Sequence, residues 1–201
     1  MTVGVTTGIG SGMSANDAIS LAQAGDTGFG ILGLAGAMAV GLVFVLAGLS
    51  KLRHRELLTG VIANYRLLPS ALIGPAAVLL PPAELALGTA LLLGGHWLAA
   101  MGAMALLLVF AAAMAINIRR GRSQIDCGCG RSQLRQPLSW LLVGRNVALA
   151  ALLAARLVPG PAVSTADIMI ALAGGLAIFV IVQLFNAIGA LAASPLSSPR
   201  R

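Results

Sequence analysis

The sequence predicts an all-α protein: a polytopic transmembrane helix bundle of about five spans. It comprises a four-helix core, one further span and a short interfacial helix after the first span. Three observations predict this class. Apolar residues make up 58% of the 201 residues and charged residues only 9%, unlike a soluble domain. The charges are also clustered, and the runs between them repeatedly supply the ~20 apolar residues that a helix needs to cross the bilayer core.

Residues 1–28 are expected to form a disordered, polar tail ahead of the first span. This stretch is rich in Gly, Ser and Thr and lacks Lys and Arg, so it has no basic region of the kind that begins a signal peptide. The first span is predicted over residues 29–49. Within it, Gly33, Ala37 and Gly41 follow one another at four-residue intervals, which lets a neighbouring helix approach closely.

A short amphipathic segment precedes the second span. Apolar residues recur on one helical face of residues 57–68, which predicts a helix lying along the membrane surface and closed by Pro69. The second span is predicted over residues 71–93. Its adjacent Pro81 and Pro82 lack backbone donors, so we expect a kink or a local opening there.

Three further spans complete the predicted bundle, at residues 97–118, 138–157 and 168–191. An arginine-rich loop, residues 119–137, joins the third span to the fourth. The chain is therefore expected to divide into a tail, a membrane domain, and a fifth helix with a short polar tail, at residues 1–28, 29–157 and 158–201.

The basic residues predict the orientation of the bundle. They gather in the loops after the first and third spans and at the carboxy terminus, and they are almost absent from the other two loops. Because cytoplasmic loops favour Lys and Arg, we expect the amino terminus outside and the carboxy terminus in the cytoplasm. The net charge of +7 is then a consequence of topology. With only 4% aromatic residues, we expect no nucleic-acid partner.

Cys127 and Cys129 are the only cysteines of the chain, and they lie in the arginine-rich loop with one glycine between them. Cationic neighbours favour the thiolate, the reactive form of cysteine, although Asp126 opposes them. A disulfide across one intervening residue closes a very small ring and is easily exchanged. The spacing therefore suits thiol exchange better than structural stapling. The flanking arginines are Arg119, Arg120, Arg122, Arg131 and Arg135.

Two other interpretations of the cysteine pair stay open. The thiols are either incidental, in a flexible loop, or half of a metal site. A structural zinc site needs four ligands, and the only histidines are His54 and His96, of which His96 falls on the opposite side of the membrane. Redox chemistry is the leading interpretation, and no metal is expected.

Glu84 and Arg145 are the charged residues expected inside spans. An ionisable group there is costly and marks a functional or pairing site. We predict either a Glu84–Arg145 pair or a polar cavity shared by the two; the alternative is separate roles, with Arg145 reaching to the interface. For the other polar residues of the spans, interhelical hydrogen bonding is expected. These are Asn117, Asn146, Gln183 and Asn186.

Several blocks of sequence, in this order, resemble the methylamine utilisation protein MauE family, a branch of the DoxX-like redox-associated membrane proteins. The blocks are Phe44-Val45-Leu46-Ala47-Gly48-Leu49-Ser50-Lys51-Leu52-Arg53, Tyr65-Arg66-Leu67-Leu68-Pro69, Leu80-Pro81-Pro82-Ala83-Glu84-Leu85-Ala86-Leu87-Gly88, Asn117-Ile118-Arg119-Arg120-Gly121-Arg122, Asp126-Cys127-Gly128-Cys129-Gly130 and Arg145-Asn146. The resemblance covers about residues 29–157.

The resemblance implies a multi-pass accessory protein of the bacterial inner membrane. Its role would be maturation of the methylamine dehydrogenase small (beta) subunit, through folding, export or disulfide formation, beside a thioredoxin-like partner. Cys127 and Cys129 would be the redox pair, supported by Asp126, Glu84, Arg145 and Asn146. A non-enzymatic maturation factor is favoured over an enzyme.

Two alternatives to the maturation factor are retained. The first is a membrane thiol–disulfide oxidoreductase of the DoxX or vitamin K epoxide reductase type, for which quinone is the candidate cofactor. The second is a small-molecule transporter using the cavity at Glu84. One conflict stands out: disulfides of exported proteins form outside the cytoplasm, whereas the charge rule places Cys127 and Cys129 inside.

Overall fold

The computed structural model describes residues 14–94, 97–125, 137–158 and 164–192. In these ranges the chain forms helices and no strand, and five of the helices are long and apolar enough to cross a membrane. The predicted all-α, five-span class is therefore confirmed. The elements are α1 (Ala15–Arg53), α2 (Arg55–Tyr65), α3 (Ser70–Leu92), α4 (Trp97–Arg119), α5 (Trp140–Ala154), the 3₁₀ turn η1 (Ala155–Leu157) and α6 (Thr165–Ala192).

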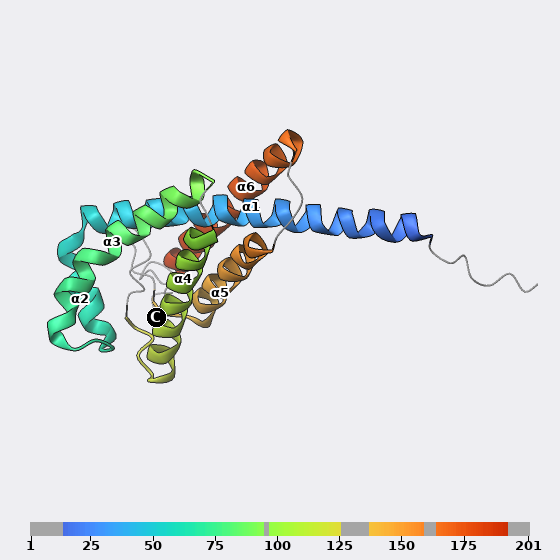
Figure 1. Cartoon of the computed structure of the whole chain (residues 1–201). Coiled ribbons are helices and arrows are strands. Elements are labelled where there is room, and N and C mark those ends of the chain that lie inside the picture. Colours follow the sequence, from blue (N-terminus) through green and yellow to red (C-terminus); the bar gives the residue numbers. More distant parts are fainter. Residues whose placement is uncertain (1–13, 95–96, 126–136, 159–163, 193–201) are drawn as a thin grey trace, which may run out of the picture.

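The long helix α1 organises the bundle (Figure 1). It packs against α3 and α6, and it also contacts α5 and η1. The helices α4 and α5 form a second close pair, and α4 also contacts α3. Among these helices, α6 packs chiefly on α1. The bundle is therefore built from two well-packed groups of helices.

Small residues allow the close contacts of α1. A Cβ atom at Gly33 would lie 2.7 Å from the backbone nitrogen of Arg156 in η1. A Cβ atom at Gly88 of α3 would lie 2.9 Å from the carbonyl oxygen of Gly41. Ala37, between the two glycines of α1, is 3% exposed. The predicted close approach along this stripe is confirmed, and it involves two different neighbours.

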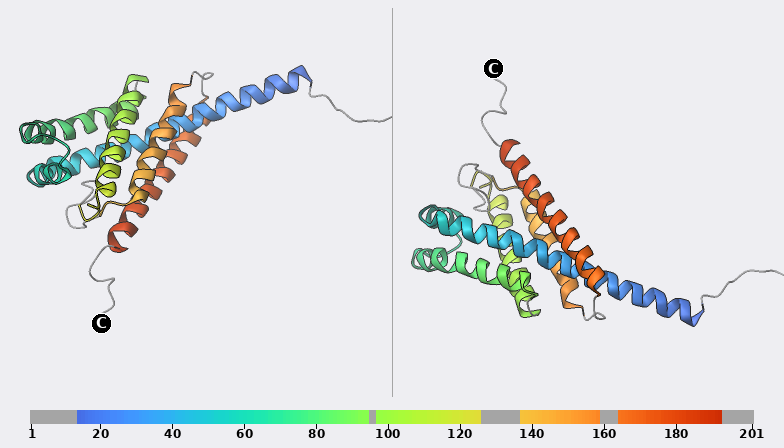
Figure 2. Two further views of the ribbon diagram at one scale, coloured as in Figure 1. Left: turned by 90° about the horizontal axis from the view of Figure 1, so that it is seen from below. Right: turned by 90° about the horizontal axis from the view of Figure 1, so that it is seen from above.

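The start of α1 differs from the prediction. The helix begins at Ala15, directly after Ser14, so residues 15–28 of the expected disordered tail are helical. Serine is a favoured N-cap residue, and alanine, leucine and glutamine in this stretch are compatible with a helix. With 39 residues, α1 is about 58 Å long, and its amino-terminal part projects beyond the other helices (Figure 2). Residues 1–13 lie outside the described part.

The second and third helices also differ in detail from the sequence expectations. The interfacial segment is confirmed as a helix, although it ends at Tyr65, where Arg66 adopts a left-handed conformation with φ 49°. The next helix, α3, runs continuously through Pro75, Pro81 and Pro82. The expected local opening is therefore absent, even though the prolines donate no backbone hydrogen bonds.

The last two spans begin at side-chain caps. Ser139 accepts a hydrogen bond from the backbone nitrogen of Leu142 at 3.4 Å, which starts α5 at Trp140. At α6, Ser164 Oγ accepts from the backbone nitrogen of Asp167, and Asp167 Oδ2 accepts from that of Ser164. These reciprocal bonds satisfy two donors that a helix start leaves free. They explain why α6 begins at Thr165, before the predicted 168.

Candidate functional site

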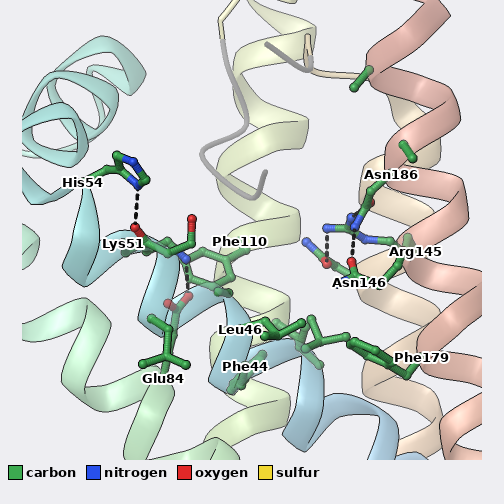
Figure 3. Close-up of a pocket in the computed structure, with 18 of the residues that line it drawn as sticks. Phe44, Leu46, Lys51, His54, Glu84, Phe110, Arg145, Asn146, Phe179 and Asn186 are labelled. Carbon is green, nitrogen blue, oxygen red and sulfur yellow. Dashed lines mark hydrogen bonds and ion pairs between the residues drawn. The ribbon is translucent and has the colours of Figure 1, made fainter. Parts of the chain in front are cut away.

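A cavity of about 1390 Å³ lies among α1, α3, α4, α5 and α6. Most of its lining is aliphatic or aromatic, and polar side chains are gathered in two groups (Figure 3). The first group is centred on Lys51 and Glu84 and the second on Arg145. Phe44, Leu46 and Phe110 lie between the groups in this view. Mixed linings of this kind are typical of ligand sites, whose volumes usually range over ~300–1,000 Å³.

Lys51 and Glu84 form a buried ion pair between α1 and α3. Lys51 Nζ lies 2.5 Å from Glu84 Oε1, and the two side chains are 10% and 1% exposed. The ammonium also lies 5.4 Å from the ring centroid of Phe110 on α4, within the range of a cation–π contact. Mutual neutralisation is what makes such burial tolerable in a low-dielectric interior.

Arg145 forms the second polar group, between α5 and α6. Its Nη1 donates to Asn186 Oδ1, and its Nη2 donates to Asn146 Oδ1 at 3.2 Å. Asn186 Nδ2 in turn donates to Gln183 Oε1 at 3.3 Å. The guanidinium is thereby held inside the bundle by amide oxygens, and Asn186 makes the interhelical bond expected of it.

Two buried donors of this second group have no hydrogen-bond acceptor among the described residues: Arg145 Nε and Asn146 Nδ2. The side chain of Asn146 is 3% exposed. In the described part of the chain, no carboxylate lies within ion-pair distance of Arg145. Because buried polar groups are nearly always satisfied, the Arg145 side of the cavity has capacity to bind a further acceptor.

The described residues on either side of the cysteine-bearing segment (residues 126–136) pack beside the cavity. Met114, Leu138 and Leu142 form a buried cluster, against which Ile125, Phe110 and Phe185 pack. Phe110 also lines the cavity. Ile125 and Leu138, which flank the segment, therefore belong to the same apolar cluster as the cavity-lining residue Phe110. The backbone nitrogen of Leu138 donates to the carbonyl oxygens of Ser123 and Ile125 and ties the two ends together.

Arg122 anchors the start of this loop to two helices. Its Nη2 donates to the carbonyl oxygen of Asn64 at 2.8 Å, and its Nη1 donates to Asn117 Oδ1 at 3.4 Å. Asn117 Nδ2 donates to the carbonyl oxygen of Ala113 one turn earlier in α4. The structure thus uses Asn117 within its own helix and loop, whereas an interhelical bond was expected.

The sequence-predicted site residues fall into two sets. Cys127, Cys129 and Asp126 lie outside the described residues. Glu84 and Arg145 are described, and the direct pair predicted for them is wrong, because Glu84 pairs with Lys51 and Arg145 binds two amides. Both residues line the same cavity, as the alternative prediction of a shared polar cavity expects.

Lys51 is the functional-site residue that the sequence reasoning missed. In the sequence, Lys51 belongs to the basic residues that gather after the first predicted span. The available signal was its position within three residues of the end of α1 at Arg53, where a side chain can still turn back into the bundle.

Comparison with known proteins places this architecture in a family. The family model for methylamine utilisation protein MauE matches residues 30–159. The chain belongs to the MauE family. The match includes α2 to α5 and the part of α1 that lines the cavity. Asn186 and Gln183 on α6 lie beyond it.

Several proteins named methylamine utilization protein MauE are similar in sequence to this chain. It is 54% identical to methylamine utilization protein MauE of Paracoccus denitrificans over 112 residues, which cover 55% of this chain and 60% of that protein. It is 45% identical to that of Methylorubrum extorquens over 136 residues, covering 66% and 73%. It is 41% identical to that of Paracoccus versutus over 155 residues, covering 75% and 83%. No solved structure matches the chain significantly.

Proposed function

We propose that this MauE-family protein is a membrane accessory factor of methylamine utilisation, which assists maturation of the methylamine dehydrogenase small subunit. Family membership over residues 30–159 carries the proposal. The similar proteins of Paracoccus denitrificans and Methylorubrum extorquens are both named methylamine utilization protein. The five apolar helices fit a multi-pass protein of the bacterial inner membrane.

The proposed chemistry is thiol–disulfide exchange at Cys127 and Cys129. If the pair faces the exterior, its disulfide form accepts two electrons and two protons from two thiols of the client, which become a disulfide. The arginines of the loop favour the thiolate needed for each exchange. A thioredoxin-like partner completes the exchange with the client, and a membrane electron acceptor, for which quinone is the candidate, reoxidises the pair.

The side of the membrane on which the pair works determines the direction of electron flow. The positive-inside rule places residues 126–136 in the cytoplasm, where the pair would collect reducing equivalents and pass them to a partner. If the loop instead faces the exterior, the pair acts directly on the exported client, in the compartment where disulfides form. Both arrangements use the same two thiols.

A double substitution tests the proposed role. In a methylamine-grown strain that depends on this protein, Cys127→Ser with Cys129→Ser is expected to lower the yield of disulfide-bonded small subunit at least about tenfold. Ser123→Ala, in the same loop, is the control, because only the backbone oxygen of Ser123 is used by Leu138. Immunoblotting of membranes shows that each variant accumulates. A normal yield of mature subunit with both cysteines removed would refute the thiol chemistry.

A further inference from the structure

Arg145 is a cation without a described counter-ion inside a transmembrane helix. The span Trp140–Leu157 contains it, and it lies about 8 Å along α5 from Trp140. A lone charge at such a position is costly and is normally paired. Its guanidinium binds the amides of Asn146 and Asn186, and the residue is half-buried.

The charge balance of the cavity favours an anion. Among the described lining residues, the charged side chains are Lys51, Arg53, Arg145 and the single carboxylate Glu84. Lys51 neutralises Glu84. The Arg145 side therefore retains a positive charge, together with the unused donors Arg145 Nε and Asn146 Nδ2.

The rest of the cavity fits a hydrocarbon chain. Phe44, Leu46, Phe179 and Val180 line it, and its volume of about 1390 Å³ exceeds that of ordinary small-ligand pockets. A group with acidic oxygens would accept from Arg145 and Asn146, while an attached apolar chain would lie along these side chains. Charge-assisted bonds of this kind are stronger than neutral ones.

We propose that the cavity binds an acidic amphiphile, with its phosphate or carboxylate group at Arg145 and Asn146 and its hydrocarbon chain along the apolar wall. Anionic phospholipids and free phosphate share this headgroup chemistry, and only the phospholipid also supplies the hydrocarbon chain of the proposal. The proposal does not rest on the thiol chemistry, since the two residues that carry it, Arg145 and Asn146, lie on α5.

Native mass spectrometry of the full-length protein in neutral detergent tests the inference. With equimolar phosphatidylglycerol and phosphatidylcholine, we expect phosphatidylglycerol to be retained. Arg145→Gln is expected to weaken this binding about 10- to 100-fold, the factor for one charge-assisted hydrogen bond. The control is Arg55→Gln, which removes an exposed cation near the start of α2 and should leave binding within about twofold.

A second variant keeps the test valid if Arg145→Gln fails to fold. Asn146→Asp has nearly the same shape and supplies a carboxylate beside Arg145, so it should remain folded and lose the lipid. Inorganic phosphate that binds in an Arg145-dependent way as tightly as phosphatidylglycerol would show that the hydrocarbon chain contributes nothing, and it would overturn the amphiphile. Equal phosphatidylglycerol retention by the wild type and both variants, or preferential retention of ubiquinone independent of Arg145, would overturn the inference.

Discussion

Neutralising only one member of the Lys51–Glu84 pair should destabilise the bundle far more than neutralising both. At 2.5 Å between Nζ and Oε1, the gross attraction is about 6–7 kcal/mol with an effective dielectric constant of 20. Desolvation of the two ions opposes it by several kcal/mol each. Lys51→Met or Glu84→Gln alone is therefore expected to lower the free energy of unfolding by about 3–5 kcal/mol.

The double variant Lys51→Met with Glu84→Gln should cost only about 1–3 kcal/mol, since one neutral amide is then left buried. Reversible unfolding in mixed micelles, followed by circular dichroism, measures the stability of the wild type, the two single variants and the double variant, which together form a double-mutant cycle. Arg53→Met and Glu56→Gln are matched controls at exposed positions, and each should stay within about 0.5 kcal/mol of wild type. Additive single effects, with a double variant as unstable as their sum, would refute the pairing.

Two further predictions concern packing and topology. Gly175→Ala should destabilise the α1–α6 contact by about 1–3 kcal/mol, because its Cβ atom would lie 2.6 Å from Met38 Cβ and 2.8 Å from the carbonyl oxygen of Ala35. Gly144→Ala, with open space around it, should be neutral or stabilising by up to ~1 kcal/mol in the same unfolding assay; similar losses in both would contradict the packing. Cys127 should resist an impermeant maleimide in intact cells and react after permeabilisation, because the charge rule places it inside; ready labelling of intact cells would reverse the topology.

The sequence was sufficient for the number of spans because length and apolar content decide whether a helix can cross a bilayer. The ends of the helices were harder to predict from the sequence. Helix α1 starts after Ser14, inside a stretch whose composition is typical of a polar tail. The hydrogen bonds between Ser164 and Asp167 set the start of α6. Capping residues of this kind are a weaker signal in the sequence than a long run of apolar residues.

The partners of the buried charges could not be predicted in the same way. Spacing along one helix gives the depth of Glu84 and Arg145, whereas their neighbours depend on which helices pack together. α1 brings Lys51 to Glu84, and α6 brings Asn186 to Arg145. The small-residue stripe of α1 indicated close packing but not its partner, and so the shared cavity was predictable while its two separate polar groups were not.

The central claim, that Cys127 and Cys129 undergo thiol–disulfide exchange during maturation of a methylamine dehydrogenase subunit, is tested most directly by acid trapping and alkylation of the two thiols in growing cells. Both the dithiol and the disulfide forms are expected to be present during growth on methylamine. The ratio of the two forms is expected to shift when the client subunit is deleted. A pair that stays fully reduced, or fully oxidised, with and without the client would rule out thiol–disulfide exchange as its role.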